Sequence, residues 1–571
     1  MNNKFFIVIP ILLLTMILYT RCTKVLDKSD LSAIPEQAVW NDVNLATAYV
    51  NRLYLDIMPT WPTNASGESD EAGGGTALMY GQYTENSVDY WTNPYSYIRN
   101  VNILLRDIAI GKLTVTEQNS LKGQALFLRA WQYFQLVSRY GGVPLILKPQ
   151  GLEEDLKVSR NKTSECITQI IKDLDDAAAL LPNSWTGTEQ GRITKGAALA
   201  VKGRVLLHYA SEQYDPTQSA SGRWTAAYDA NKIAKDINVT AGKALLSNFK
   251  EKYIIEGVAN TEAIFVTRFN NPGRTHNRDA CTRPLDEAQN CTGADQPSLA
   301  MVQAYPMING LPITDPASGY NPNAFWLNRD PRFAATIAYN GCLWELSGKS
   351  GRIQWTFTGS QQTGGSNGFY CKKGLFEGYK SNETEISGTD WIELSFAEVL
   401  MNLAESANET GKTSEAYDVL ISIRKRAGIE IGVNGMYGLK SGMTKVEMRE
   451  AILQERRLEF AFEGKRPQDM RRRRLYASMN GTKRKGLDIK LIAFGGEKSA
   501  FYVAYAAGTV NLNTNYSTYF TDVVRDLDLG TNIINYKSEY YFYAIPLTHI
   551  EKNVNLLQTK GWTSGTFDPL L

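Results

Sequence analysis

Hydrophobic residues recur at helical spacing along several long stretches of the chain. In residues 121–140 the large apolar side chains are three or four positions apart, a spacing that places them on one face of an α-helix. This face consists of Phe127, Trp131, Phe134 and Val137. Gly141, Gly142 and Pro144 follow, and glycine and proline commonly terminate helices. We therefore predict a core helix that ends at Gly141.

Other stretches have the same character. Residues 163–181 carry a stripe of isoleucine, leucine and alanine between Thr163, which is able to cap a helix, and Pro182, which ends it. Residues 195–210 predict a helix whose small alanines allow close approach of a neighbour. Residues 391–428 predict a helix, a glycine turn and a second helix. This pair resembles a tetratricopeptide unit, although no strict period of roughly 34 residues runs through the chain.

The composition changes outside the helical segments, which cover about residues 40–210 and 390–475. Residues 211–390 are rich in Gly, Asn, Pro and Thr, so we predict short strands and long loops there. Residues 476–571 form a second irregular segment. Loops of this length are usually functional. The sequence therefore predicts a mainly α fold, in which a tetratricopeptide-like scaffold of helical hairpins carries a loop-rich, irregular binding half with short strands.

The charge balance narrows the range of partners. The chain of 571 residues contains 61 Lys and Arg and 59 Asp and Glu, which gives a formal net charge of +2. Such a chain has no overall field to hold a polyanion, so we expect no nucleic-acid partner. The aromatic share is 11%. Tyrosine and tryptophan combine an apolar face with a polar tip, which suits hydrated binding surfaces.

The N-terminus has the pattern of an export signal. Lys4 precedes the apolar run FFIVIPILLLTMILY, which is shorter than the roughly 20 residues that span a bilayer. Cys22 follows in the position of the lipid-acceptor cysteine of bacterial lipoproteins, although Arg21 stands where a small residue is normal. We predict a signal peptide at residues 1–21 and lipidation of Cys22. The alternative is an ordinary export signal followed by an incidental cysteine.

The other cysteines lack the spacing of a metal site. Cys166 falls on an apolar helical face, which predicts a buried thiol. Cys281 with Cys291, and Cys342 with Cys371, lie in loop-rich sequence and could pair in an oxidising compartment, but spacing alone establishes neither disulfide. The three histidines are far apart. We therefore expect no metal site, no cofactor and no histidine-dependent catalytic set.

Three carboxylates recur every four residues near the end of the second helical segment, at Glu455, Glu459 and Glu463. Like charges at this spacing repel each other on a helix, so they need cations. The nearby cations are Arg456, Arg457, Arg466 and the run 471–474. We predict a structural network of salt bridges rather than acid–base machinery. The arginine run has no wider basic surface around it and does not indicate a nucleic-acid site.

Five segments, taken in order, resemble a known family. They are GQALFLRAWQYFQLVSRYGGVPLI, GRITKGAALAVKGRVLLH, NRDPRF, ILQERRLEFAFEGKRPQDMRR and YAIPLTHIEKNVNLLQTKGW. Their joint order resembles the SusD/RagB family of outer-membrane nutrient-binding lipoproteins of Bacteroidetes. The resemblance implies one SusD-like domain over residues 22–571. One departure is Pro467, where an aromatic residue is common in the family.

This resemblance implies a function. Members are anchored by lipid to the outer membrane at the cell surface and cover a SusC-like TonB-dependent transporter as a hinged lid. They capture an oligosaccharide and pass it to the transporter without catalysis, so we expect a glycan-binding lipoprotein that is not an enzyme. The alternatives are a RagB-like peptide-binding lipoprotein, an accessory lid without a ligand, and a secreted glycoside hydrolase, which needs two carboxylates about 5 to 10 Å apart.

Aromatic residues in loops are the candidates for ligand binding, because sugar rings stack their C–H faces on Trp or Tyr while polar side chains bond the hydroxyl groups. The first loop offers Trp61, Tyr80, Tyr83 and Trp91, and the middle region offers Trp326, Trp344 and Trp355. Candidate polar partners are Arg274, Asn277 and Arg278. The alternative for each aromatic residue is packing against the scaffold or the transporter. Residues on helical stripes are assigned to the core, namely Tyr97, Trp131 and Trp391.

Overall fold

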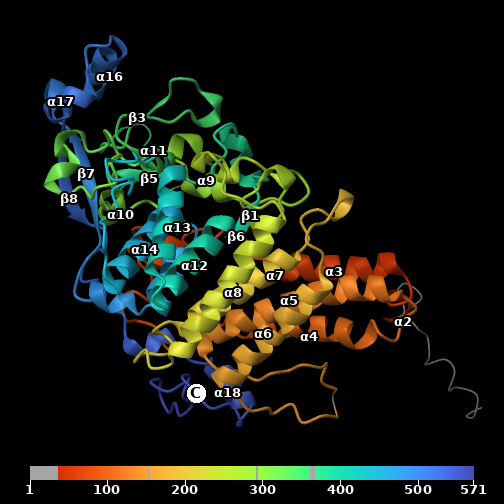
Figure 1. Cartoon of the computed structure of the whole chain (residues 1–571). Helices are drawn as coiled ribbons and strands as arrows, with labels where there is room; N and C mark the ends of the chain where they lie inside the picture. The colour runs from red at the N-terminus through yellow and green to blue at the C-terminus, as the bar shows by residue number, and fades with distance from the viewer. Residues whose placement is uncertain (1–35, 152, 291–292, 361, 363–366) are drawn as a thin grey trace, which may run out of the picture.

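Long helices that contact one another form one side of the molecule (Figure 1). The computed structural model describes residues 36–571 except 152, 291–292, 361 and 363–366. The first helices are α2 Glu36–Val39, α3 Val43–Ile57, α4 Thr92–Asp107, α5 Val115–Tyr140, α6 Thr163–Leu180, α7 Lys195–Ala210 and α8 Ser221–Thr240. A second group packs against α7 and α8 through α12, and it comprises α12 Phe396–Glu409, α13 Thr413–Ala427 and α14 Lys445–Glu459. The predicted scaffold of helical hairpins is confirmed.

The sequence of α5 supplies both a start signal and an end signal. Thr114 caps its first turn and forms a capping box with Glu117, which satisfies backbone donors that the helix leaves unpaired. Gly141 ends the helix with φ 72°, as predicted, since glycine adopts positive φ without strain. In α6, however, Thr163 is the first helical residue, and its hydroxyl donates to the Pro569 carbonyl at 2.7 Å. The prediction that Thr163 caps this helix is wrong.

The helix α8 lies inside residues 211–390, where the loop-rich composition predicts strands and loops. Its side-chain amides donate to α7, from Asn231 to the Gly203 carbonyl at 3.2 Å and from Asn238 to the Gly196 carbonyl at 3.1 Å. A Cβ at Gly203 would lie 2.2 Å from the Asn231 side-chain oxygen, so this close approach requires glycine. The sequence analysis did not predict this helix, because alanines and two asparagines, rather than large apolar residues, form much of its buried face.

The opposite side of the molecule holds short strands and short helices between long loops (Figure 1). In the described residues, four antiparallel two-stranded sheets pair β1 with β6, β2 with β5, β3 with β4 and β7 with β8. The strands are β1 Ala263–Thr267, β2 Ile337–Tyr339, β3 Cys342–Leu343, β4 Ile353–Gln354, β5 Phe369–Cys371, β6 Trp391–Ser395, β7 Lys485–Leu491 and β8 Phe520–Asp526. The short helices of the described chain as a whole, on either side, are α9 Arg278–Thr282, α10 Leu299–Ala304, α11 Pro331–Thr336, α15 Lys465–Arg472, α16 Lys498–Ala506, α17 Leu512–Tyr519 and α18 Leu547–Lys552. The predicted loop-rich half with short strands is confirmed.

A network of buried ion pairs surrounds the end of α14. Arg332 of α11 contacts Glu455 at 2.6 Å and Glu459 at 3.1 Å, and all three side chains are fully buried. Glu463 contacts Lys252 at 2.9 Å, also in the interior. The predicted salt-bridge network is confirmed, but these cations come from segments far away in the sequence rather than from the neighbouring arginines.

A second group of buried ion pairs joins α7 to β6 and α12. Arg204 contacts Glu393 at 2.6 Å and Glu398 at 2.7 Å. Lys465 of α15 contacts Glu393 at 2.7 Å. Because a buried charge without a partner is costly, these pairs fix elements that are distant in the sequence.

Trp61 lies in an aromatic cluster beside β6. Its ring centroid is 4.9 Å from that of Trp391 and 5.0 Å from that of Tyr253. His276 packs on Trp61 with ring centroids 5.6 Å apart. Burial disfavours the charged imidazolium and lowers the pKa of His276 to about 4.

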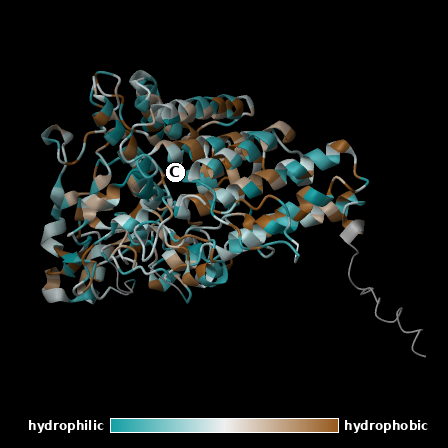
Figure 2. Ribbon diagram, turned by 90° about the horizontal axis from the view of Figure 1, so that it is seen from below, coloured by the Kyte–Doolittle hydropathy of each residue, from teal (hydrophilic) through white to brown (hydrophobic). Residues whose placement is uncertain are grey.

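The helices in Figure 2 carry hydrophobic and hydrophilic residues along their lengths. None of the helices described is both long enough and apolar enough to cross a membrane. Trp131 and Trp391 are buried and Tyr97 packs on the core, so their predicted core positions are confirmed. The predicted signal peptide at residues 1–21 and the lipidation site Cys22 lie outside the described residues.

Among the described cysteines, Cys166, Cys342 and Cys371 are free and buried. The predicted buried thiol at Cys166 is confirmed. The suggested disulfide between Cys342 and Cys371 is wrong, because both thiols are free; the two residues lie on strands of different sheets, β3 and β5. Cys281 is disulfide-bonded, and its suggested partner Cys291 lies outside the described residues.

We expect Arg332→Met to lower the free energy of unfolding by about 3 to 5 kcal/mol, because it leaves buried carboxylates without their shared cation. Urea denaturation followed by circular dichroism measures this loss. The control is Arg52→Met, which removes an ion pair from an arginine side chain that is 72% exposed and should cost less than about 1 kcal/mol. Similar small losses in both variants would contradict the structural role of Arg332.

The stability of the protein should fall as the pH drops from about 6.5 to 4, partly because of His276. The unfolded chain binds a proton on this imidazole near its ordinary pKa of about 6.5, whereas the folded protein does so only near pH 4. This group contributes its full stabilisation above pH 6.5 and loses up to about 3 kcal/mol at the lower pH. Urea denaturation across this range should show a weaker pH dependence for His276→Gln than for the wild type. An equal pH dependence would rule out this contribution.

Candidate functional site

The aromatic residues predicted in the first loop pack mainly inside the protein. Trp61 and Trp91 each have only 7% of their surface exposed. Tyr80 and Tyr83 are half-buried, and the Tyr80 hydroxyl donates to Asp528 at 2.6 Å. Residues of other elements cover both indoles, among them Trp391 at Trp61 and Tyr140 at Trp91. The two indoles therefore pack as scaffold residues.

The tryptophans of the middle region are buried as well. Trp326, Trp344 and Trp355 have exposed fractions of 9%, 1% and 6%. Aromatic neighbours cover them: Trp326 stacks on Tyr339 with centroids 5.3 Å apart, and Trp355 lies 5.1 Å from Phe501. The prediction that these indoles stack on a ligand is therefore corrected to a packing role.

The three polar residues predicted to contact a ligand differ in their exposure to solvent. Arg278 is buried, pairs with Asp295 and lies 5.5 Å over the Trp61 ring, so it belongs to the interior. Asn277 is exposed just before α9. Arg274 is half-buried and lines a basic cleft that is described below.

A cleft of about 430 Å³ lies beside the first loop, and we name it the tyrosine–arginine cleft. Its walls come from residues 59–68, α5, α15 and the C-terminal segment. The residues that define it here are Asn64, Glu68, Tyr90, Trp131, Gln135, Arg139, His208, Glu393, Gln468, Arg471 and Tyr543. It therefore lies next to the loop where aromatic ligand contacts were predicted, but different side chains line it.

The centre of this cleft is a pair of stacked tyrosine rings, each in contact with an arginine. Tyr90 is 40% exposed and stacks on Tyr543 with ring centroids 6.1 Å apart. The Arg139 guanidinium lies 4.4 Å over the Tyr90 ring, and the Arg471 guanidinium lies 4.4 Å over the Tyr543 ring. The Arg471 guanidinium also donates to the Tyr543 hydroxyl. Cation–π contacts of this kind hold both rings in fixed orientations.

Polar groups surround the stack at the cleft mouth. Asn64 and Gln468 are exposed there, and Glu68 is half-buried. The Nε atom of Arg471 is buried and has no hydrogen-bond partner within the described part of the protein. Arg139 donates to the Gln135 side chain at 2.9 Å. The cleft thus combines flat ring faces with several donors and acceptors.

Trp131, His208 and Glu393 line the cleft and are buried. Trp131 is buried there, so this core residue also borders the ligand space. Burial, with the nearby Arg472, holds the pKa of His208 well below its usual value, which keeps the imidazole uncharged. Glu393 is ion-paired with Arg204 and Lys465. This leaves Glu68 as the lining carboxylate without a salt bridge among the described residues, so the cleft lacks a pair of available carboxylates for acid–base hydrolysis.

Sequence reasoning missed the main residues of this stack. Tyr90 directly precedes the candidate Trp91, and local sequence does not distinguish the exposed ring from the buried one. Arg139 lies on the predicted core helix, and Tyr543 and Arg471 are distant in the sequence. The sequence feature that could have indicated these residues is the high density of aromatic residues in DYWTNPY and YYFYAIP.

Comparison with known proteins agrees with this architecture. The chain matches the SusD family over residues 261–562, and a family described as "Starch-binding associating with outer membrane" over residues 61–207. SusD-like protein P2 of Formosa agariphila is 23% identical over 403 residues, covering 68% of this chain and 71% of that protein. A crystal structure of a SusD-like protein from Bacteroides fragilis superimposes with a TM-score of 0.74 at 25% identity, covering 94% of this chain and 100% of the other. Because the SusD model spans more than half of its length, the chain belongs to the SusD family.

Proposed function

We propose that this protein is a glycan-binding lipoprotein of the cell surface that captures an oligosaccharide in the tyrosine–arginine cleft and has no catalytic activity. The observation that carries the proposal is the stacking of Tyr90, which is partly exposed, on Tyr543. One guanidinium group lies over each of the two rings. Tyr90 keeps 40% of its surface exposed, and we propose that this open part of the ring contacts the C–H side of a sugar. Asn64 and Gln468, which are exposed in the cleft lining, bond the hydroxyl groups.

The stack offers a ligand both aromatic ring surface and N–H donors, which suits a sugar. The guanidinium faces of Arg139 and Arg471 are covered by tyrosine rings, so their N–H edges remain as directional donors. Rings held in place before binding lose little conformational freedom when a ligand arrives. The description of one matching family as starch-binding supports the same class of ligand.

We further propose that the protein delivers its ligand to a SusC-like TonB-dependent transporter in the outer membrane. Support comes from membership of the SusD family and from the second family description, which names association with the outer membrane. The cysteine behind the apolar N-terminal run provides a lipid anchor. Co-purification of the protein with the transporter encoded next to it tests this partnership, and its absence from such a complex would remove the delivery step.

Tyr90→Ala should weaken binding of the oligosaccharide by about 1 to 3 kcal/mol, by analogy with the stacking of bases on aromatic side chains. The ligand is first identified by screening the wild type on a glycan array, and calorimetric titration then measures both proteins. The matched control is Tyr228→Ala, which removes a tyrosine that lies 4.2 Å from Lys412 outside the cleft and should leave affinity unchanged.

Three results would count against this assignment. Equal affinity of Tyr90→Ala and wild type would place the glycan elsewhere. Binding of a peptide library without any glycan would favour the RagB-like peptide-binding alternative. Release of reducing ends during incubation with the bound glycan would show a hydrolase.

Cys22→Ala should release the protein from the membrane fraction, because the thiol that accepts the lipid is lost. Fractionation of cells followed by immunoblotting measures the distribution. Cys166→Ala is the matched control, since this thiol is buried and free, and it should remain with the membrane. Detergent-dependent membrane attachment of Cys22→Ala would contradict the lipid anchor.

A further inference from the structure

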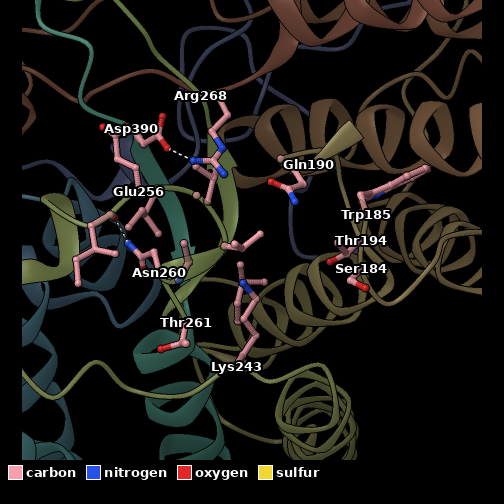
Figure 3. Close-up of a pocket in the computed structure, with 18 of the residues that line it drawn as sticks. Ser184, Trp185, Gln190, Thr194, Lys243, Glu256, Asn260, Thr261, Arg268 and Asp390 are labelled. Carbon is pink, nitrogen blue, oxygen red and sulfur yellow. Dashed lines mark hydrogen bonds and ion pairs between the residues drawn. The ribbon is translucent and has the colours of Figure 1, made fainter. Parts of the chain in front are cut away.

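A second cleft lies between the loop before α7, the loop after α8 and the ends of β1 and β6 (Figure 3). Its volume is about 270 Å³, and it shares Gln190, Arg192 and Arg268 with an adjoining hollow of about 360 Å³. We name the two together the basic cleft. It shares no lining residue with the tyrosine–arginine cleft.

Strand pairing builds one wall of the basic cleft. Thr267 at the end of β1 pairs with Trp391 at the start of β6, so the next residue, Arg268, lies beside Asp390 and forms an ion pair with it (Figure 3). Gly191 lies against this arginine with φ 94°, and a Cβ there would be 3.0 Å from the Arg268 Nε atom. The opposite loop therefore approaches Arg268 closely, with Gln190 directed across the cleft in Figure 3.

Basic side chains outnumber acidic ones along the cleft. Its cations are Arg192, Lys243, Lys252, Arg268 and Arg274, and its acids are Glu256 and Asp390. Three of the cations are engaged in ion pairs, Arg192 with Glu189, Lys252 with Glu463 and Arg268 with Asp390. Lys243 and Arg274 have no acidic partner among the described residues, and the one lining acid without an ion pair there is Glu256.

These two cations are also partly removed from water. Burial, with the nearby Arg268, lowers the pKa of Lys243. Burial alone lowers the pKa of Arg274, whose guanidinium lies 5.0 Å over the Phe269 ring. Desolvation of a cation without a counterion costs free energy, and a bound anion would offset this cost. Charge-assisted hydrogen bonds to an oxyanion are stronger than those between neutral groups.

We infer that the basic cleft binds an acidic oligosaccharide, whose carboxylate or sulfate groups contact Lys243 in one part of the cleft and Arg274 in the other, with Arg268 between them. Asn183 and Gln190 are exposed polar side chains on the facing loop and bond the sugar hydroxyls. The saccharide nature of the ligand rests on the proposed function, whereas the site and its charge selectivity rest on the cleft itself.

The test uses pairs of oligosaccharides that differ only in charge. One pair is an oligogalacturonate and its methyl ester, and the other is a sulfated carrageenan oligosaccharide and its desulfated form. Calorimetric titration compares the wild type, the double variant Lys243→Gln/Arg274→Gln, and Tyr90→Ala. The control is the double variant Arg99→Gln/Lys425→Gln, which also removes two positive charges. Both of its residues are exposed and lie outside the two clefts.

The wild type should bind the charged member of at least one pair at least tenfold more tightly than the neutral member. Lys243→Gln/Arg274→Gln should abolish this preference, whereas Tyr90→Ala and the control should keep it. The pair that shows the preference distinguishes carboxylate from sulfate. Equal binding of charged and neutral members, or a preference that survives Lys243→Gln/Arg274→Gln, overturns the inference.

The same experiment separates this inference from the proposed function. Tight binding of neutral glycans that Tyr90→Ala weakens, without any charge preference, leaves the glycan-binding function intact and removes the acidic site. Failure of the wild type to bind either these probes or any array glycan removes both.

Discussion

The burial of like-charged carboxylates at the end of α14 is the constraint on which the rest of the structure depends. Glu455, Glu459 and Glu463 could not be buried together without cations, and Arg332 and Lys252 reach them from the loop-rich half. The end of this helix is therefore stable only when the irregular half is in place around it. A loop-rich region with little regular hydrogen bonding gains a fixed position in the same way, since its basic residues have their counterions on the helical scaffold.

Buried ion pairs also border both clefts. Glu393, held by Arg204 and Lys465, borders the tyrosine–arginine cleft. Lys252, held by Glu463, borders the basic cleft. Each cleft is thus supported from behind by a charged residue whose rotamer is set by an ion pair, and such support holds a binding site in one geometry without a ligand.

The sequence allowed prediction of those features that depend on local spacing. The buried face of α5 and its end at Gly141 follow from residues within one helix. In contrast, α8 was not predicted, because its packing face is made largely of small and polar residues. The site was less predictable, because a loop aromatic packs equally well on a ligand or on another ring. Trp91 and Tyr90 are adjacent, but only contacts with residues far along the chain bury the first and leave the second open.

The two clefts differ in how they use their cations, and this difference favours different parts of a ligand. Arg139 and Arg471 are covered by tyrosine rings, so their charge helps to order the rings. In the basic cleft, Lys243 has neither an acidic partner nor a ring contact among the described residues. Arg274 lies over the Phe269 ring but likewise has no acidic partner there, so both charges are available to an incoming group. A chain with nearly balanced overall charge has no long-range field to attract an acidic polymer. Selectivity for such a ligand must then arise at short range, where desolvation strengthens each contact. The basic cleft provides that environment without involving the tyrosine stack.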